Sequence, residues 1–251
     1  TTDTSLQTPT GIYYSLGAVA GEVGFLFPGQ GSQYLNMGAE LPMQWREAGI
    51  AWDQAADIHM EEGKALHQVV YPQSVFTDEA KQAQEAMLLS TQWAQPAIGV
   101  ASLSQLGLLA TLGLKPAHVA GHSFGEITAL HAAGSITVED MIAVARKRGE
   151  LMNEAAALPG AMIAVAATIE TVKAALPKDS TVVVANHNAP EQVVLSGQVA
   201  GIEKATEVLE AAGLKVRALK VATAFHSEVV EDSVKPFAAF LEGIKLKKNE
   251  I

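Results

Sequence analysis

Residues Gly121-His122-Ser123-Phe124-Gly125 (GHSFG) set a serine in the pattern G-x-S-x-G. In this pattern the serine occupies a sharp turn between a strand and a helix, and the two glycines let the backbone pass closely. The helix that follows directs free backbone N–H groups at the serine oxygen, which favours negative charge there. The motif therefore predicts a nucleophilic Ser123. The alternative is a helix N-terminus that Ser123 merely caps.

The sequence on both sides of this motif supplies the context that a nucleophilic serine needs. Residues 117–120 (AHVA) predict a short strand, and residues 126–133 (EITALHAA) are helix-forming up to Gly134. A second apolar run, residues 22–27 (EVGFLF), predicts a buried strand, and residues 35–113 are mainly helical in pattern. Strands that alternate with helices in this way predict an α/β core.

A glycine-rich turn, residues 28–33 (PGQGSQ), follows the first of these strands. Such a turn can cradle a phosphate, contribute to an oxyanion hole or simply reverse the chain. It lacks the Gly-Lys-Ser/Thr ending of a phosphate-binding P-loop and the spacing of G-x-G-x-x-G. The three readings stay open on this turn alone.

An arginine interrupts the apolar side of a predicted helix near residues 138–155. Arg148 falls on the same helical stripe as the apolar residues Met141, Val144, Ala145, Met152 and Ala155. The polar residues Arg146, Lys147, Glu150 and Asn153 fall on the other side. A guanidinium on the core side destabilises the fold unless an anion meets it, so Arg148 predicts an anion-binding position.

Residues 160–222 show a separate order of predicted strands and helices. Residues 160–167 and 216–222 are strand-like, residues 181–197 predict two strands around an Asn-Ala-Pro turn, and residues 169–177 and 199–213 are helical. The order β-α-β-β-α-β is that of a ferredoxin-like unit. We therefore predict a subdomain at residues 160–222, inserted into a core formed by residues 22–159 and 223–251.

A serine nucleophile needs a general base, and the chain offers seven histidines. His226 is the favoured base because it lies just past the inserted unit, where the chain returns to the core. His122 adjoins Ser123, but neighbouring residues of such a turn point in different directions. The other histidines are predicted to lie on the surface, beside the motif or in the hairpin: His59, His67, His118, His131 and His187.

Composition excludes several classes of protein. Among 251 residues, 17 Lys and Arg face 27 Asp and Glu, for a net charge of −10, which argues against a general nucleic-acid binder. The absence of cysteine excludes disulfides, cysteine-ligated zinc and a thiol nucleophile. No apolar stretch reaches the roughly 20 residues of a membrane span. Residues 1–21 lack a basic segment and predict a linker, and we expect a cytoplasmic domain of a longer chain.

Five motifs in order carry a resemblance to a known family: residues 27–33 (FPGQGSQ), residues 121–126 (GHSFGE), Arg148-Gly149, residues 188–197 (NAPEQVVLSG) and residues 224–226 (AFH). They are similar to those of the malonyl-CoA:acyl carrier protein transacylases and the acyltransferase domains of fatty-acid and polyketide synthases. The resemblance covers about residues 22–250. Residues 71–99 and Phe124 look most like iterative synthases that make polyunsaturated fatty acids or enediyne polyenes.

This resemblance implies an α/β-hydrolase-like core with the inserted ferredoxin-like subdomain, and it implies site roles. Ser123 would be acylated and His226 would be its base. The backbone amides of Gln30 and Phe124 would form the oxyanion hole, and Arg148 would bind the free carboxylate of a malonyl group. The remaining positions that match the family's pocket are His122, Asn188 and Phe225.

The implied reaction moves a malonyl group from malonyl-CoA, through an ester at Ser123, to the phosphopantetheine thiol of an acyl carrier protein. The implied partners are that carrier protein and the other domains of a multidomain synthase. No metal and no permanently bound cofactor are implied. The alternatives are a serine thioesterase or esterase, and a catalytically silent docking domain.

The chain departs from the family's pattern in two places. In polyketide domains a histidine-alanine-phenylalanine-histidine stretch accompanies malonyl, and a tyrosine-alanine-serine-histidine stretch accompanies methylmalonyl. This chain has Thr223-Ala224-Phe225-His226, in which Phe225 favours malonyl and Thr223 departs from both patterns. Family domains also continue for roughly fifty residues beyond Ile251, so we expect the C-terminal part to be missing and apolar surface to be exposed. No Asp or Glu is assigned as a third member of the catalytic set, although Glu228 is close in sequence.

Overall fold

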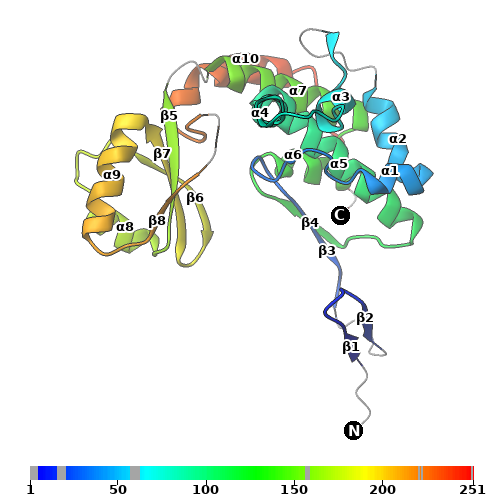
Figure 1. Ribbon diagram of the computed structural model, residues 1–251, viewed down its shortest axis with the longest axis horizontal. Helices are drawn as coiled ribbons and strands as arrows, with labels where there is room; N and C mark the ends of the chain where they lie inside the picture. The colour runs from blue at the N-terminus through cyan, green and yellow to red at the C-terminus, as the bar shows by residue number, and fades with distance from the viewer. Residues whose placement is uncertain are drawn as a thin grey trace.

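The computed structural model describes residues 5–15, 21–56, 63–155, 159–219, 221, 223–249 and 251. Figure 1 shows a larger helical core and a smaller part in which a sheet is covered by helices. The elements in chain order are β1 (Ser5–Gln7), β2 (Tyr13–Ser15), β3 (Gly24–Phe27), α1 (Glu40–Gln44), α2 (Arg46–Ala55), α3 (Leu66–Val70), α4 (Asp78–Leu89), α5 (Thr91–Thr111), β4 (His118–Gly121), α6 (Gly125–Ala132), α7 (Val138–Ala155), β5 (Gly160–Val165), α8 (Ile169–Ala175), β6 (Val183–Ala189), β7 (Gln192–Gln198), α9 (Val199–Ala211), β8 (Val216–Ala218), the 3-10 helix η2 (Glu228–Ser233) and α10 (Val234–Leu241).

The core is organised around a parallel pair of strands. β3 and β4 pair in register from Gly24 opposite His118 to Phe27 opposite Gly121. The predicted α/β core is thereby confirmed, but the prediction that residues 22–27 form a buried strand is wrong. Only Phe27 is buried, and Leu26 is 82% exposed. Alternate side chains of a strand point to opposite faces, and no described helix covers the face to which Leu26 points.

The apolar centre of the core lies among the helices. α5 packs against α2 and α7, and the buried side chains that fill the space between them come from sequence-distant segments. They include Trp52, Leu66, Val70, Trp93, Val100 and Met141. The helical character predicted for residues 35–113 is confirmed by α1 to α5. No helix in the described part of the chain has the length and apolar character that crossing a bilayer would need.

The smaller part is the predicted ferredoxin-like subdomain. Its strands form one antiparallel sheet in the order β6-β7-β5-β8, so the first and third strands of the unit are central. α8 and α9 cover one face of this sheet, as Figure 1 shows. Their contact with the sheet buries Ile163, Val165, Val193, Leu195 and Leu209. β8 is shorter than the strand predicted at residues 216–222, of which residues 220 and 222 lie outside the described residues.

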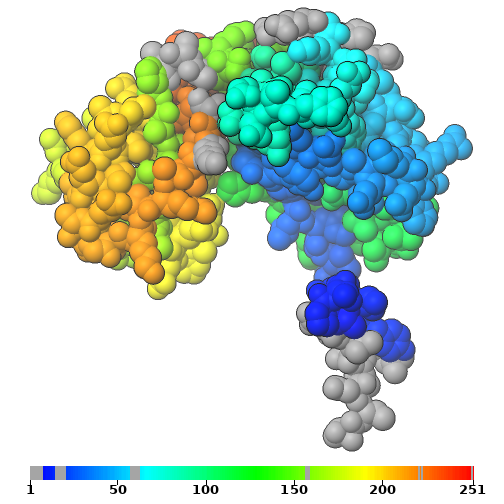
Figure 2. All heavy atoms as spheres, in the orientation of Figure 1, coloured from blue at the N-terminus to red at the C-terminus, as the bar shows by residue number. Residues whose placement is uncertain are grey.

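Part of the predicted linker at residues 1–21 forms a hairpin. β1 and β2 pair antiparallel, and Gly11 in the turn between them has a φ of +82°, which glycine adopts without strain. Figures 1 and 2 show the hairpin projecting from the start of β3, away from the rest of the chain. The division into linker, core and subdomain stays a prediction.

Candidate active site

The GHSFG motif forms the predicted turn between a strand and a helix. β4 ends at Gly121, α6 begins at Gly125, and Ser123 has a φ of +52°. This left-handed conformation is strained for a residue with a side chain. Both glycines are required by space, because a Cβ on Gly121 would lie 2.0 Å from the carbonyl carbon of Gly125, and one on Gly125 would lie 2.1 Å from the Phe27 oxygen. The glycines therefore allow the tight turn that presents Ser123.

The structure brings His226 to Ser123 across 103 residues of chain. The Oγ atom of Ser123 lies 2.9 Å from Nε2 of His226, within the range that proton transfer to a base requires. His226 also has a left-handed backbone, with a φ of +57°. The Ser227 hydroxyl stabilises the turn that holds His226, because it donates a hydrogen bond to the Ala224 oxygen at 2.7 Å. Of the two histidines weighed as the base, His226 is the one in reach.

His122 points away from Ser123. Its Nε2 atom lies 2.9 Å from Oδ1 of Asn188, a residue of β6 in the subdomain. This contact joins the turn of the core to the subdomain. It also explains why adjacency in sequence does not make His122 the partner of Ser123.

The surroundings of His226 favour its neutral form. Burial lowers its pKa, and the positive charge of Arg148 and the neighbouring His122 lower it further, while Glu126 opposes them. A neutral imidazole is the form that accepts a proton. Within the described residues no carboxylate makes a hydrogen bond or ion pair with His226, Glu228 included. The structure therefore shows a pair, Ser123 and His226, rather than a triad.

Two backbone amides beside Ser123 have no acceptor. Neither the N–H of Gln30 nor that of Phe124 donates a hydrogen bond to any described residue. The loop that carries Gln30 is pressed against the serine turn, since a Cβ on Gly29 would lie 2.3 Å from the His122 oxygen. Phe124 follows Ser123 directly, and its side chain is fully buried. Free N–H groups in this position can stabilise a negatively charged oxygen.

Arg148 lies on the buried side of α7, as its helical stripe predicts. It is half-buried, and within the described residues it makes neither a hydrogen bond nor an ion pair. Burial lowers the pKa of its guanidinium, whereas Glu126 raises it. The group stays charged at neutral pH because an arginine pKa normally exceeds 12. An unpaired, partly desolvated cation is thus available to an anion.

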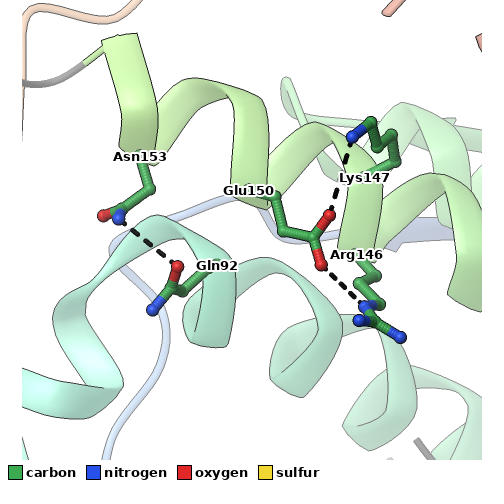
Figure 3. A network of polar contacts seen from close by, with 5 residues as sticks. All are labelled: Gln92, Arg146, Lys147, Glu150 and Asn153. Carbon is green, nitrogen blue, oxygen red and sulfur yellow. Dashed lines mark hydrogen bonds and ion pairs between the residues drawn. The ribbon is translucent and has the colours of Figure 1, made fainter. Parts of the chain in front are cut away.

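The neighbouring basic residues are used differently. On the outer side of α7, Nε of Arg146 lies 2.7 Å from Oε1 of Glu150, and Nζ of Lys147 lies 3.8 Å from Oε2 of the same residue (Figure 3). Both cations are therefore paired within their own helix. The contrast isolates Arg148 as the one of three consecutive basic residues that lacks an anionic partner in the described structure.

The position of Arg148 is fixed by the packing of α7 on the start of α5. Nδ2 of Asn153 donates to Oε1 of Gln92 at 3.3 Å, as Figure 3 shows, and Ser90 donates to Asn153 at 3.0 Å. Next to Arg148, Gly149 allows the helices to touch, because a Cβ there would lie 2.7 Å from the Thr91 oxygen. Because α7 is held closely against α5, the backbone position from which the Arg148 side chain extends is fixed.

These groups surround one small cavity, of about 100 Å³, between the core and the subdomain. Figure 2 shows a hollow between the two parts of the molecule. The lining contains every predicted side chain of the site: Gln30, His122, Ser123, Arg148, Asn188, Phe225 and His226. Thr223 is fully buried and does not line the cavity, so its departure from the family's pattern does not alter the wall directly.

Several lining residues were missed by sequence reasoning. Gln95 and Met152 come from α5 and α7, while Met162 and Val194 come from the subdomain sheet. A signal for the last two exists, because they alternate along their strands with residues that face α8 and α9. Gln95 could have been noticed as a polar residue in an otherwise apolar stretch. Within the described residues no group of three His, Asp or Glu side chains could hold a metal ion.

The site geometry agrees with comparisons to known proteins. The family model described as acyl transferase domain matches residues 24–251. The chain is 35% identical over 238 residues to the malonyl CoA-acyl carrier protein transacylase of Bacillus subtilis, covering 92% of this chain and 71% of that protein. The other curated relatives include seven large synthases, and this chain spans a tenth or less of each.

Solved structures give the same result. The acyltransferase domain from the second module of the salinomycin polyketide synthase has a TM-score of 0.82 at 34% identity, covering 97% of this chain and 55% of that one. A malonyl-transacylase in complex with a type II polyketide synthase acyl carrier protein has a TM-score of 0.79 at 30% identity, covering 92% of this chain and 73% of that one. The chain belongs to the acyl transferase domain family.

Proposed function

We propose that this chain transfers a malonyl group from malonyl-CoA to the phosphopantetheine thiol of an acyl carrier protein. The observation that carries the proposal is the unpaired guanidinium of Arg148 in the same cavity as the Ser123–His226 pair. A serine ester alone suits any acyl group. A cation beside it selects an acyl group that ends in a carboxylate.

The first half of the reaction acylates the enzyme. His226 takes the proton of Ser123 through Nε2, and Oγ attacks the thioester carbonyl. The N–H groups of Gln30 and Phe124 stabilise the negative charge that forms on the carbonyl oxygen. When that tetrahedral intermediate collapses, the C–S bond breaks and the CoA sulfur leaves with the proton held by His226.

The second half reverses these roles for another thiol. His226 takes the proton of the phosphopantetheine thiol, and the sulfur attacks the ester at Ser123. The C–O bond then breaks, and Ser123 recovers its proton from His226. Each half exchanges one acyl bond for another without a change of oxidation state, and His226 carries the one proton that moves. The proposed steps therefore use no metal, redox partner or permanently bound cofactor.

The walls of the cavity suit a short, carboxylated acyl group. Arg148 binds the carboxylate within the space of about 100 Å³ beside Ser123, and a larger hollow of about 690 Å³ adjoins this space at Arg148 and His226. Phe225 is 7% exposed and occupies the wall, where it disfavours the extra methyl of methylmalonyl. His122 and Asn188, bonded to each other at 2.9 Å, complete the polar side of the pocket.

The similarity to a malonyl-transacylase in complex with an acyl carrier protein, and to large synthases, supports the carrier-protein partner and a place among the domains of a synthase. The cytoplasm is proposed as the location. The resemblance of residues 71–99 and Phe124 points further to iterative synthases that make polyunsaturated fatty acids or enediyne polyenes. These statements remain part of the proposal.

The decisive experiment compares two arginines of one helix. Wild-type, Arg148→Ala and Arg146→Ala proteins are mixed with malonyl-, methylmalonyl- or acetyl-CoA, and acyl adducts are followed by intact-mass spectrometry. Arg148→Ala should lower kcat/KM for malonyl-CoA about ten-fold to several thousand-fold, since a charge-assisted pair contributes about 1.5–3 kcal/mol and breaking a buried one costs about 3–5 kcal/mol. Acetyl-CoA, which has no carboxylate, should lose far less. Arg146→Ala, whose partner is Glu150, serves as the matched control.

Three results would contradict the proposal. Equal losses for malonyl- and acetyl-CoA would make Arg148 a structural residue. Release of the acyl group to water rather than to a carrier-protein thiol would identify a hydrolase instead. Failure of the wild-type protein to form any adduct would indicate a silent docking domain.

A further inference from the structure

Gln95 is a polar residue in a buried position with apolar neighbours. It lies near the start of α5 and is 1% exposed, and its neighbours Ala94 and Ala97 are fully buried. Its side chain lines the same cavity as Ser123. Burying an amide without all its hydrogen bonds destabilises a fold, so packing alone would favour leucine or methionine here. The glutamine therefore calls for a role in the site.

The contacts of Gln95 lead to the loop that carries Gln30. Nε2 of Gln95 lies 3.4 Å from Oε1 of Gln30, a long hydrogen bond, and 3.4 Å from the sulfur of Met152. The Gln95 oxygen and the Gln30 Nε2 atom are buried and have no partner in the described structure. If both amides turned over, one N–H₂ group and one oxygen would still be left over. The two glutamines are thus each other's polar contact at the cavity wall.

Gln30 needs such an anchor because glycines flank it on both sides. Gly31 has a φ of +107°, and glycine peptides rotate more easily than others. The loop's own bonds run from Ser32 to the Gly29 oxygen, at 2.8 and 3.3 Å, and from the Gly31 N–H to Oε1 of Gln33, at 2.7 Å. None of them uses the backbone N–H or the side chain of Gln30. Within the described residues, Gln95 is the one hydrogen-bond partner of the Gln30 side chain.

We propose that Gln95 is a positioning residue that acts through the Gln30 side chain to fix the direction of the Gln30 backbone N–H beside Ser123. The inference rests on the proposed function, because it requires a negatively charged oxygen to form there. A donor stabilises that charge only if it already points at the oxygen when the charge develops. α5 suits the task, since a long helix packed against α2 and α7 is a rigid support.

The test replaces the amide and keeps the volume. Gln95→Met should slow single-turnover acylation of Ser123 about ten-fold to a hundred-fold, less than the 10²–10³ that loss of a whole oxyanion donor costs. The factor should be the same for malonyl- and acetyl-CoA, because both form the oxyanion. The melting temperature should be unchanged or higher, because an unpaired buried amide is removed.

A second variant separates positioning from packing. Gln30→Ala keeps the backbone N–H but removes the side chain that Gln95 holds, so it should show the same loss. In the double variant the second substitution should add less than about two-fold, since residues that act as one unit are not additive.

Three results would overturn the inference: an unchanged acylation rate in Gln95→Met, a loss confined to malonyl-CoA, or losses that multiply in the double variant. Failure of the proposed function looks different, because the wild-type protein itself would then form no adduct or would release the acyl group to water.

Discussion

The core and the subdomain differ in backbone strain and in the number of buried polar atoms without a hydrogen-bond partner. The three non-glycine residues with positive φ in the described chain, Asn36, Ser123 and His226, all lie outside the subdomain. Among the described residues, six buried polar side-chain atoms have no partner. Five of these atoms belong to the core, and the Ser196 hydroxyl belongs to the subdomain. Strained backbone and unpaired polar groups thus collect in the core, where Ser123, His226, Gln30 and Gln95 line the cavity, whereas the subdomain sheet is almost free of them.

This difference indicates a division of labour. The core supplies the nucleophile, the arginine and the oxyanion donors. The cost of holding these groups strained or unpaired is offset by favourable contacts in the rest of the fold. The subdomain supplies a relaxed wall and the Asn188 contact to His122. Substitutions in the two regions should therefore differ in their effect on acylation, and the largest effects are expected in the core.

Ser123→Ala should abolish the acyl adduct, because the substitution removes only the attacking oxygen. The strained φ of +52° is no worse for alanine than for serine, so the fold should persist. Intact-mass spectrometry with malonyl-CoA measures the adduct, and circular dichroism checks the fold. A malonyl adduct that remains on the variant would move the nucleophile elsewhere.

His226→Ala should slow acylation about 10²- to 10⁴-fold, the usual contribution of a general base. The expectation depends on the 2.9 Å contact between Nε2 and the Ser123 oxygen. His122→Ala should cost less, because that histidine is bonded to Asn188 instead. Single-turnover rates compare the two variants, and a larger loss for His122→Ala would reverse the assignment.

The pH dependence should respond to Arg148. Only neutral His226 accepts a proton, so the rate falls as the pH drops through its pKa, which burial and Arg148 hold below the ordinary value near 6.5. Removing the guanidinium removes one of these causes, so the pKa rises and the acid limb moves to higher pH. Profiles of kcat/KM for acetyl-CoA on wild-type, Arg148→Ala and Arg146→Ala proteins measure it. No shift, or a shift of equal size in Arg146→Ala, would argue against a direct effect.

Much of the fold could be predicted because its signals are local. The glycines around Ser123 are dictated by contacts as short as 2.0 Å, and the side of α7 that carries Arg148 follows from helical spacing. The βαββαβ order follows from alternating apolar periods. Such patterns leave a direct trace in the sequence.

What could not be predicted depends on contacts between distant segments. The base could only be ranked among seven histidines, because the folding of residues 160–222 decides which one reaches Ser123. The exposure of Leu26 depends on what covers β3. Gln95 reaches the cavity only because α5 packs beside α7 and the Gln30 loop. Pairing of residues 5–15 as a hairpin likewise has no strong local signal.

The smallest effect on acylation is expected from the interior of the subdomain. Leu209 of α9 is fully buried against the face of the sheet that points away from the cavity. Leu209→Ala should lower the free energy of unfolding by about 2–5 kcal/mol through the lost contacts and the space left behind. Acylation per folded molecule should change less than about two-fold, because the cavity wall is built by the opposite face, including Met162 and Val194. Denaturant unfolding gives the stability, and the fraction of protein that acquires the acyl group corrects the rate for unfolded chains. A Val194→Ala protein is the matched comparison on the cavity face, where acylation itself should change. If Leu209→Ala slows the chemistry as much as Val194→Ala does, the subdomain acts as one body with the active site rather than as a relaxed wall beside it.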